Sequence, residues 1–225
     1  VSYSHMAATV YNNRAYVIGG LDKQVGIECQ VYTSENNSWL FEFPSLPKGR
    51  FNSVCFVYRD SLYVFGGTDN SSNMNEIVRY DLSTQNSGEW TTIAKVNEAN
   101  QRGGVAFVVE DKVYAGLGEK SNGIRNGFYV SSDSLTKWEL IPSIPAQLGV
   151  ISSGVYDEQK KSFFMIDNDG KIWEYNLTTE QWTSRSLCIR MKNYHMFMLD
   201  GSIYILGQDI YQKNKFTVYN PIWDN

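Results

Sequence analysis

The sequence predicts an all-β fold, a β-propeller with about five blades of four short strands each. Three observations predict it: a five-residue motif that recurs five times, a tryptophan that follows each copy, and short strand-like runs bounded by turn residues. No segment of about ten or more residues shows a helical period. The length of 225 residues suits one all-β domain, and 42% hydrophobic with 20% charged residues is a globular composition.

The recurring motif is an aromatic–apolar run that ends in a glycine pair in its first two copies. The copies are Tyr16-Val-Ile-Gly-Gly20, Tyr63-Val-Phe-Gly-Gly67, Tyr114-Ala-Gly-Leu-Gly118, Phe163-Phe-Met-Ile-Asp167 and Tyr204-Ile-Leu-Gly-Gln208. Their first residues lie 47, 51, 49 and 41 positions apart, and the tryptophans that follow them are Trp39, Trp90, Trp138, Trp182 and Trp223. A repeat of about 40–50 residues with four strands is typical of a propeller blade.

Each repeat reads as four strands in order. The first strand is an apolar or alternating run, such as residues 53–58, and a charged turn such as Arg59-Asp60 ends it. The aromatic motif is the second strand, and a polar loop leads to the third, such as residues 76–80. A Ser/Thr/Asn turn then precedes the tryptophan strand. We expect the glycine pairs to let the backbone pass close to a neighbouring blade, and the tryptophans to fill the space between blades.

We expect one domain over residues 1–225, with blades at approximately 1–46, 47–97, 98–146, 147–186 and 187–225. The last repeat stops near the end of a third strand, without a fourth. This leaves two interpretations. The chain forms either a five-bladed or irregular propeller, or part of a larger propeller whose ring is incomplete here, and we favour the second. An open ring would expose a blade face and a strand edge. Because the chain begins without Met, we interpret it as a piece of a longer protein.

The repeats resemble those of the kelch family of β-propellers, as found in the kelch domain of BTB-kelch proteins. The resemblance rests on the two Tyr-x-x-Gly-Gly motifs, on the stretch 78–84 that leads to Trp90, and on Leu46-Pro47-Lys48-Gly49-Arg50. It covers the whole chain, strongly over 1–97 and weakly over 147–225. The family pattern has a His 11 residues before each motif and an Arg two residues earlier. Here the His positions hold His5, Asn52, Gly103, Ser152 and Asn193, and only Arg50 keeps the Arg in register.

The resemblance implies a non-catalytic protein–protein interaction module, and by extension a substrate-recognition part of a cullin-type ubiquitin ligase. Its partner would lie on one rim, formed by loops within blades (21–27, 68–75, 119–126 and 209–214) and segments between blades (44–52, 97–103, 142–149 and 186–193). The candidate binding residues are Lys23, Arg50, Asn52, Arg102, Arg125, Arg190, Asn193 and Tyr211. Since guanidinium binds carboxylates through two parallel hydrogen bonds, we expect an acidic peptide. An alternative for Arg50 is that it braces adjacent blades.

A second interpretation is a small-molecule propeller, such as a sialic acid mutarotase or a sugar-binding protein, that uses the axial funnel. We expect no metal and no cofactor, because the two histidines are 190 residues apart and the three cysteines show no ligand spacing. His5 and His195 could meet across a ring, but a structural hydrogen-bonding role for His5 is favoured.

Charge and hydropathy exclude two further classes of partner. The net charge of −4 argues against nucleic acid and anionic membranes as partners. No signal peptide and no apolar run of about 18 residues is present. An odd number of widely spaced cysteines suits a reducing compartment, and we expect a cytoplasmic protein.

Overall fold

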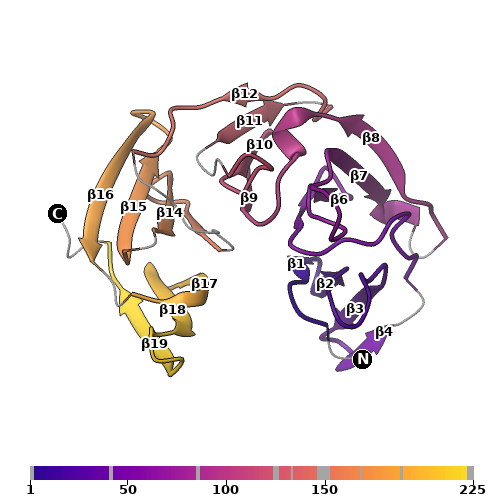
Figure 1. Cartoon of the computed structure of the whole chain (residues 1–225), viewed down its shortest axis with the longest axis horizontal. Helices are drawn as coiled ribbons and strands as arrows, with labels where there is room; N and C mark the ends of the chain where they lie inside the picture. Colours follow the sequence, from indigo (N-terminus) through magenta and orange to yellow (C-terminus); the bar gives the residue numbers. More distant parts are fainter. Residues whose placement is uncertain are drawn as a thin grey trace.

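A computed structural model shows five antiparallel sheets arranged in chain order around a common centre (Figure 1). It describes residues 3–40, 43–84, 87–123, 127–132, 134–145, 153–167, 169–187 and 190–221. Over these residues, four sheets have four strands and the last has three, so the prediction of an all-β propeller with about five blades is confirmed. Among the described residues, no helix is long and apolar enough to cross a bilayer.

The strands of each blade pair in the order in which they occur along the chain. Blade one contains β1 (Ala7–Tyr11), β2 (Arg14–Ile18), β3 (Cys29–Thr33) and β4 (Ser38–Leu40). Blade two contains β5 (Val54–Tyr58), β6 (Ser61–Phe65), β7 (Glu76–Asp81) and β8 (Thr91–Lys95), with the short 3-10 helices η1 (Leu82–Thr84) and η2 (Asn97–Ala99). Blade three contains β9 (Val105–Val109), β10 (Lys112–Gly116), β11 (Phe128–Ser132) and β12 (Glu139–Leu140).

The last two blades complete the arrangement. Blade four contains β13 (Val155–Asp157), β14 (Ser162–Ile166), β15 (Lys171–Asn176) and β16 (Gln181–Leu187). Blade five contains β17 (Lys192–Leu199), β18 (Ser202–Gln208) and β19 (Asn214–Tyr219). The first strands lie towards the centre and the fourth strands at the periphery, and an opening separates blade five from blade one (Figure 1).

Tight turns join the first and second strands, as the charged turn residues predict. In blade two, Tyr58 pairs with Ser61, and the two residues between them, Arg59 and Asp60, have φ values of 46° and 54°. Positive φ at both positions matches the turn geometry that suits the right-handed twist of paired strands. In blade four, Asp157 pairs with Ser162, so this turn is two residues longer.

The longer turn corrects one repeat position. By strand register, the residue of blade four that corresponds to Tyr16 and Tyr63 is Phe164, because it lies two positions after the residue that opens the second strand. The expected start of this motif at Phe163 was therefore wrong by one residue. Since side chains of a strand alternate between faces, Phe163 points to blade three and Phe164 to blade five.

The glycine pairs bring each blade against the segment that enters the next one. Gly66 and Gly67 have φ values of 64° and 95°, in the region that non-glycine residues rarely adopt. The N–H of Gly67 donates to the carbonyl of Gln101 at 2.8 Å, and a Cβ on Gly66 would lie 2.6 Å from the carbonyl oxygen of Ala99. In blade one, the N–H of Gly20 donates likewise to the Arg50 carbonyl at 2.9 Å. The predicted close approach is confirmed.

Three tryptophans pack between blades as predicted. The indole N–H of Trp90 donates to the carbonyl of Pro44 at 2.9 Å, in the segment that leaves blade one. Trp138 packs on Phe65 of blade two with ring centroids 5.2 Å apart, and Trp182 packs on Phe128 of blade three at 6.3 Å. Each of these tryptophans thus contacts the blade that precedes its own. Trp223 lies outside the described residues.

Candidate functional site

Loops within blades and segments between blades form one edge of the propeller, which we call the rim. The N–H groups of Leu46 and Arg50 donate to the carbonyls of Ile27 (2.8 Å) and Gly26 (3.1 Å), so the segment after blade one lies against its within-blade loop. The side-chain amide of Asn73 donates to the Glu119 carbonyl at 2.8 Å, which joins the loops of blades two and three. These contacts bring described parts of the expected loops of blades one to three together on one edge.

Arg50 does not contribute to the exposed rim. Its side chain is fully buried, and its guanidinium donates to the carbonyl of Gly66 at 3.1 Å and to the carboxylate of Glu76 at 3.5 Å. Burial lowers the pKa of this guanidinium, and the negative charge of Glu76 opposes the shift. Because Arg50 enters from the segment after blade one and both partners belong to blade two, the contacts support the bracing role. Arg50 is therefore not part of the candidate binding surface.

Asn52 has a backbone role that its residue type explains. Its φ is 50°, and His5 and Gly103, at the equivalent positions of blades one and three, have φ values of 57° and 70°. Asparagine and glycine tolerate this left-handed conformation best. The N–H of Asn52 donates to the His5 carbonyl at 2.9 Å, and the N–H of Gly103 donates to the Asn52 carbonyl at 2.7 Å. Hydrogen bonds at these positions therefore join three blades around the axis.

Three rim ion pairs place the acid inside and the cation outside. The pairs are Lys48–Asp69 (2.7 Å), Arg102–Glu119 (3.0 Å) and Lys215–Asp209 (3.5 Å). The side chains of the three cations are 56%, 46% and 38% exposed, whereas those of the three acids are 18%, 17% and 10% exposed. In these three pairs the cation is the more exposed partner, whereas in the rim pair Arg190–Asp169 the acid is the more exposed one, at 80% against 60%.

Backbone donors hold two of these acids in their ionised form. The pKa of Asp69 falls to about 2, because Lys48 hydrogen-bonds its carboxylate and the N–H groups of Ser72 and Ser71 also donate to it. The pKa of Asp209 is lowered mainly by the N–H of Lys213, which donates at 3.0 Å. The carboxylates thus fix the loop tips and remain charged at neutral pH.

The other expected rim residues differ in their surroundings. Lys23 is exposed on the blade-one loop, and Tyr211 is 76% exposed on the blade-five loop beside Ile210, which is 58% exposed. Arg190 pairs with Asp169 at 3.0 Å, and both side chains are mostly exposed. Arg125 lies outside the described residues, and so does the side chain of Asn193 in β17.

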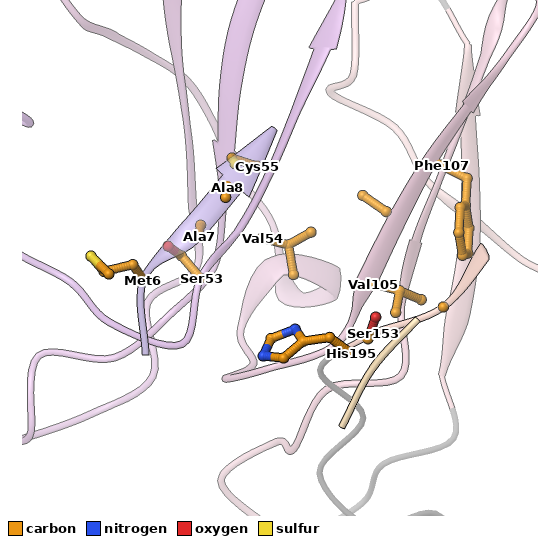
Figure 2. Close-up of a pocket in the computed structure, with 13 residues that line it drawn as sticks. Met6, Ala7, Ala8, Ser53, Val54, Cys55, Val105, Phe107, Ser153 and His195 are labelled. Carbon is orange, nitrogen blue, oxygen red and sulfur yellow. The ribbon is translucent and has the colours of Figure 1, made fainter. Parts of the chain in front are cut away.

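The axis holds a cavity, at the place where the second interpretation expects a funnel, and none of its lining residues is among the candidate binding residues predicted from the sequence. It has a volume of about 270 Å³, and Figure 2 shows His195, Ser53 and Val105 among the side chains around it. The sequence signal is the small residues near the starts of the first strands, which are Ala8, Ser53, Gly104 and Gly154.

An adjoining cavity of about 530 Å³ is lined by both His5 and His195. The two histidines therefore border the same space, as the sequence allows across a ring. Within the described ranges, no three His, Cys, Asp or Glu side chains are grouped as a metal site requires.

Comparisons with known proteins agree with the repeat pattern. A family model described as the KLHDC2/KLHL20/DRC7 Kelch-repeats domain matches residues 2–148. Kelch-like protein 36 of Mus musculus is 26% identical over 166 residues, which cover 68% of this chain and 26% of that protein. Kelch repeat and BTB domain-containing protein 1 of Ectromelia virus (strain Moscow) is 25% identical over 227 residues, which cover 95% of this chain and 39% of that protein.

The fold is also similar to a solved structure, that of YjhT, with a TM-score of 0.80 at 16% identity. The match covers 97% of this chain and 84% of the YjhT chain, so about one-sixth of YjhT has no counterpart here. The chain spans between about a quarter and two-fifths of the lengths of the two curated relatives.

Proposed function

Since this chain belongs to the kelch-repeat family, of the KLHDC2/KLHL20/DRC7 type, we propose that it is a non-catalytic protein-interaction module whose rim binds an acidic segment of a partner protein. The observation that carries the proposal is the order of charges in three rim ion pairs, Lys48–Asp69, Arg102–Glu119 and Lys215–Asp209, in which the cation is more exposed than the acid. An approaching carboxylate meets Lys48 and Arg102 before it meets Asp69 and Glu119.

The geometry of Arg102 supports this proposal. Its Nε and Nη2 donate to a single oxygen of Glu119, at 3.2 and 3.0 Å, and the guanidinium is half-exposed. Arginine has five N–H donors in a fixed fork, so a carboxylate of a partner can add to the pair without displacing Glu119. Lys23 supplies a further exposed cation on the within-blade loop of blade one.

Tyr211 and Ile210 supply the apolar part of the proposed surface. Both side chains are mostly exposed at the tip of the blade-five loop, and the Asp209 carboxylate accepts from the N–H of Tyr211 at 2.8 Å, which fixes the tip. A preorganised tyrosine is a frequent anchor in protein interfaces, because it buries a large area at small entropic cost.

We further propose that the partner protein is a substrate of a cullin-type ubiquitin ligase, and that this chain recognises it in the cytoplasm. This proposal rests on family resemblance and on relatives whose names include a BTB domain. The described thiols of Cys29 and Cys55 are free and buried, which suits a reducing compartment.

An array of peptides tests the proposal. Peptides with runs of Asp and Glu are compared with the same peptides carrying Asn and Gln, at two salt concentrations. We expect the purified chain to retain only the acidic set, and to retain less of it at high salt, because the recognition is electrostatic. Equal retention of both sets would contradict an acidic partner.

A sugar-binding propeller is the second candidate, and the axial cavities favour it. Two imidazoles, from His5 and His195, and the half-buried side chain of Asn52 border one space. A thermal-shift screen with sialic acid and common sugars tests this candidate. A ligand-dependent rise in Tm that is lost in His195→Ala, but not in Lys23→Glu, would favour it over the rim.

A further inference from the structure

The two axial cavities adjoin and have no charged walls. The cavities of about 270 and 530 Å³ share Met6, Ala8, Ser53, Gly104 and His195 among the residues that line them. Over the described ranges, no Lys, Arg, Asp or Glu lines either cavity. A charged group that entered this space would lose its hydration and find no counter-charge. The cavities therefore favour an uncharged occupant.

Ser53 supplies a hydrogen-bonding group that the fold leaves unused. Its side chain is 9% exposed and lines both cavities, and its hydroxyl has no hydrogen-bond partner among the described residues. Ser153, which lines the smaller cavity from blade four, instead accepts a hydrogen bond from the N–H of Met196 at 2.7 Å. Because a buried polar group without a partner costs free energy, the Ser53 hydroxyl indicates an occupant with a donor or an acceptor.

Much of the remaining lining is apolar. In the smaller cavity it includes Met6, Val54 and Phe107, and Figure 2 shows these side chains around the same space as Ser53 and His195. Met6 is 43% exposed, and the flexible thioether of methionine adapts to a bound aromatic ring and contacts it favourably. An occupant with an apolar body and one polar group matches these walls. Among protein side chains, tyrosine combines a large apolar ring with a hydroxyl that can both donate and accept.

The larger cavity borders the loops that carry rim cations. Ser4, which lines it, exchanges backbone hydrogen bonds of 2.9 and 2.8 Å with Leu21, two residues before Lys23. Gly103 lines the same cavity and follows Arg102 directly in the chain. Cations of the rim thus lie beside a space whose own walls carry no charge. A segment whose acids bind at the rim can therefore place an uncharged side chain in the cavity.

We propose that the acidic partner segment carries a tyrosine between its carboxylates, and that this side chain enters the axial cavity and hydrogen-bonds Ser53. The ring lies against Met6, which lines the same two cavities. The carboxylates on either side remain at the rim, beside Lys23 and Arg102. This inference rests on the proposed function of the rim, and it adds what the partner needs besides negative charge.

Fluorescence anisotropy with labelled peptides tests the proposal. Each peptide carries Asp and Glu on both sides of one variable position, which holds Tyr, Phe or Asp. We expect the Tyr peptide to bind the purified chain at least about tenfold more tightly than the Asp peptide, because a carboxylate in the cavity stays unpaired. Phe in place of Tyr removes one hydrogen bond and should raise Kd about threefold to tenfold.

A double-mutant cycle assigns that hydrogen bond to Ser53. In Ser53→Ala the Tyr and Phe peptides should bind alike, since the phenol then has no partner in the cavity. The control is Ser134→Ala, in the turn between β11 and β12 and outside both cavities, and it should keep the wild-type difference. Ala8→Leu fills the space from β1 and should remove the preference for Tyr over Asp.

Equal Kd values for the Tyr, Phe and Asp peptides in the wild type would overturn the tyrosine anchor and leave the rim proposal standing. A preference for Tyr that survives in both Ser53→Ala and Ala8→Leu would also overturn it. Failure of every acidic peptide to bind would overturn both proposals. A sugar that raises Tm in the wild type but not in Ser53→Ala, without any preference for tyrosine, would assign the cavity to a small ligand and overturn the anchor.

Discussion

The guanidinium of Arg50 lies 3.5 Å from the carboxylate of Glu76, and this pair ties the segment after blade one to the third strand of blade two. The Arg50 side chain has no exposed surface, so its charge is compensated within the fold. A basic residue in a family motif is thus structural here, while Arg102, which is outside that register, reaches the surface.

Replacing Arg50 should destabilise the fold strongly. Arg50→Ala removes a fully buried side chain and leaves the Gly66 carbonyl without a donor, while Glu76 keeps Lys95 as its cation. We expect a loss of about 2–3 kcal/mol in the free energy of unfolding. Urea unfolding followed by tryptophan fluorescence measures the change. Arg102→Ala, in a half-exposed pair, is the control and should cost less than about 1 kcal/mol. Similar losses for both variants would contradict the bracing role.

The glycine pairs should not tolerate a side chain. Gly66→Ala places a Cβ 2.6 Å from the Ala99 carbonyl at a positive φ, so the next blade must shift. The matched control is Gly201→Ala. Gly201 has a similar φ of 71°, but a Cβ added there would have no atom within 4 Å, so this variant measures only the cost of the backbone conformation, about 1 kcal/mol. We expect a clearly larger fall in the free energy of unfolding for Gly66→Ala. An equal fall for the two variants would show that the close approach of the next blade does not contribute to the cost of a side chain at position 66.

The two kinds of tryptophan should differ in their effect on stability. Trp90→Ala removes an interblade side chain with a hydrogen bond to Pro44, and we expect a loss of about 3 kcal/mol or more. Trp39→Ala in the 225-residue chain should cost far less, since this side chain is nearly half-exposed. Differential scanning calorimetry of both variants provides the comparison, which would fail if Trp39→Ala lowered Tm as much as Trp90→Ala.

Most of the fold was predictable from the sequence because the same residue types recur at the same positions of each repeat. The Tyr-x-x-Gly-Gly strands and the tryptophans follow from strand packing and close approach, which act within one repeat or between neighbours. The shift from Phe163 to Phe164 was not predictable, since it depends on a turn that is two residues longer.

The site was less predictable than the fold. Sequence places Arg50 and Arg102 in equivalent loops, but only the structure shows that one is buried and the other half-exposed. The axial cavity is lined by residues of all five blades, which are far apart in the chain, so no local motif marks it.

The rim should lose its internal ion pairs in acid. The folded-state pKa of Asp69, about 2, lies below its ordinary value of 3.8, so the pair with Lys48 stabilises the fold above about pH 4. That contribution should disappear as the pH falls from about 4 to about 2. Carboxyl NMR titration should show a midpoint near 2, and Lys48→Met should raise it. An Asp69 midpoint near 3.8 in the wild type would contradict the assignment.

The most direct test of the proposed function measures the affinity of a selected acidic peptide by fluorescence anisotropy. The double variant Lys23→Glu/Arg102→Gln changes the rim, and Lys112→Glu changes an exposed cation at the opposite end of a blade-three strand. We predict at least about a tenfold rise in Kd for the rim variant, because a hydrogen bond to a charged group contributes about 1.5–3 kcal/mol. The control should keep the wild-type Kd. An unchanged Kd for the folded rim variant, or an equal loss in the control, would contradict binding of an acidic partner at the rim.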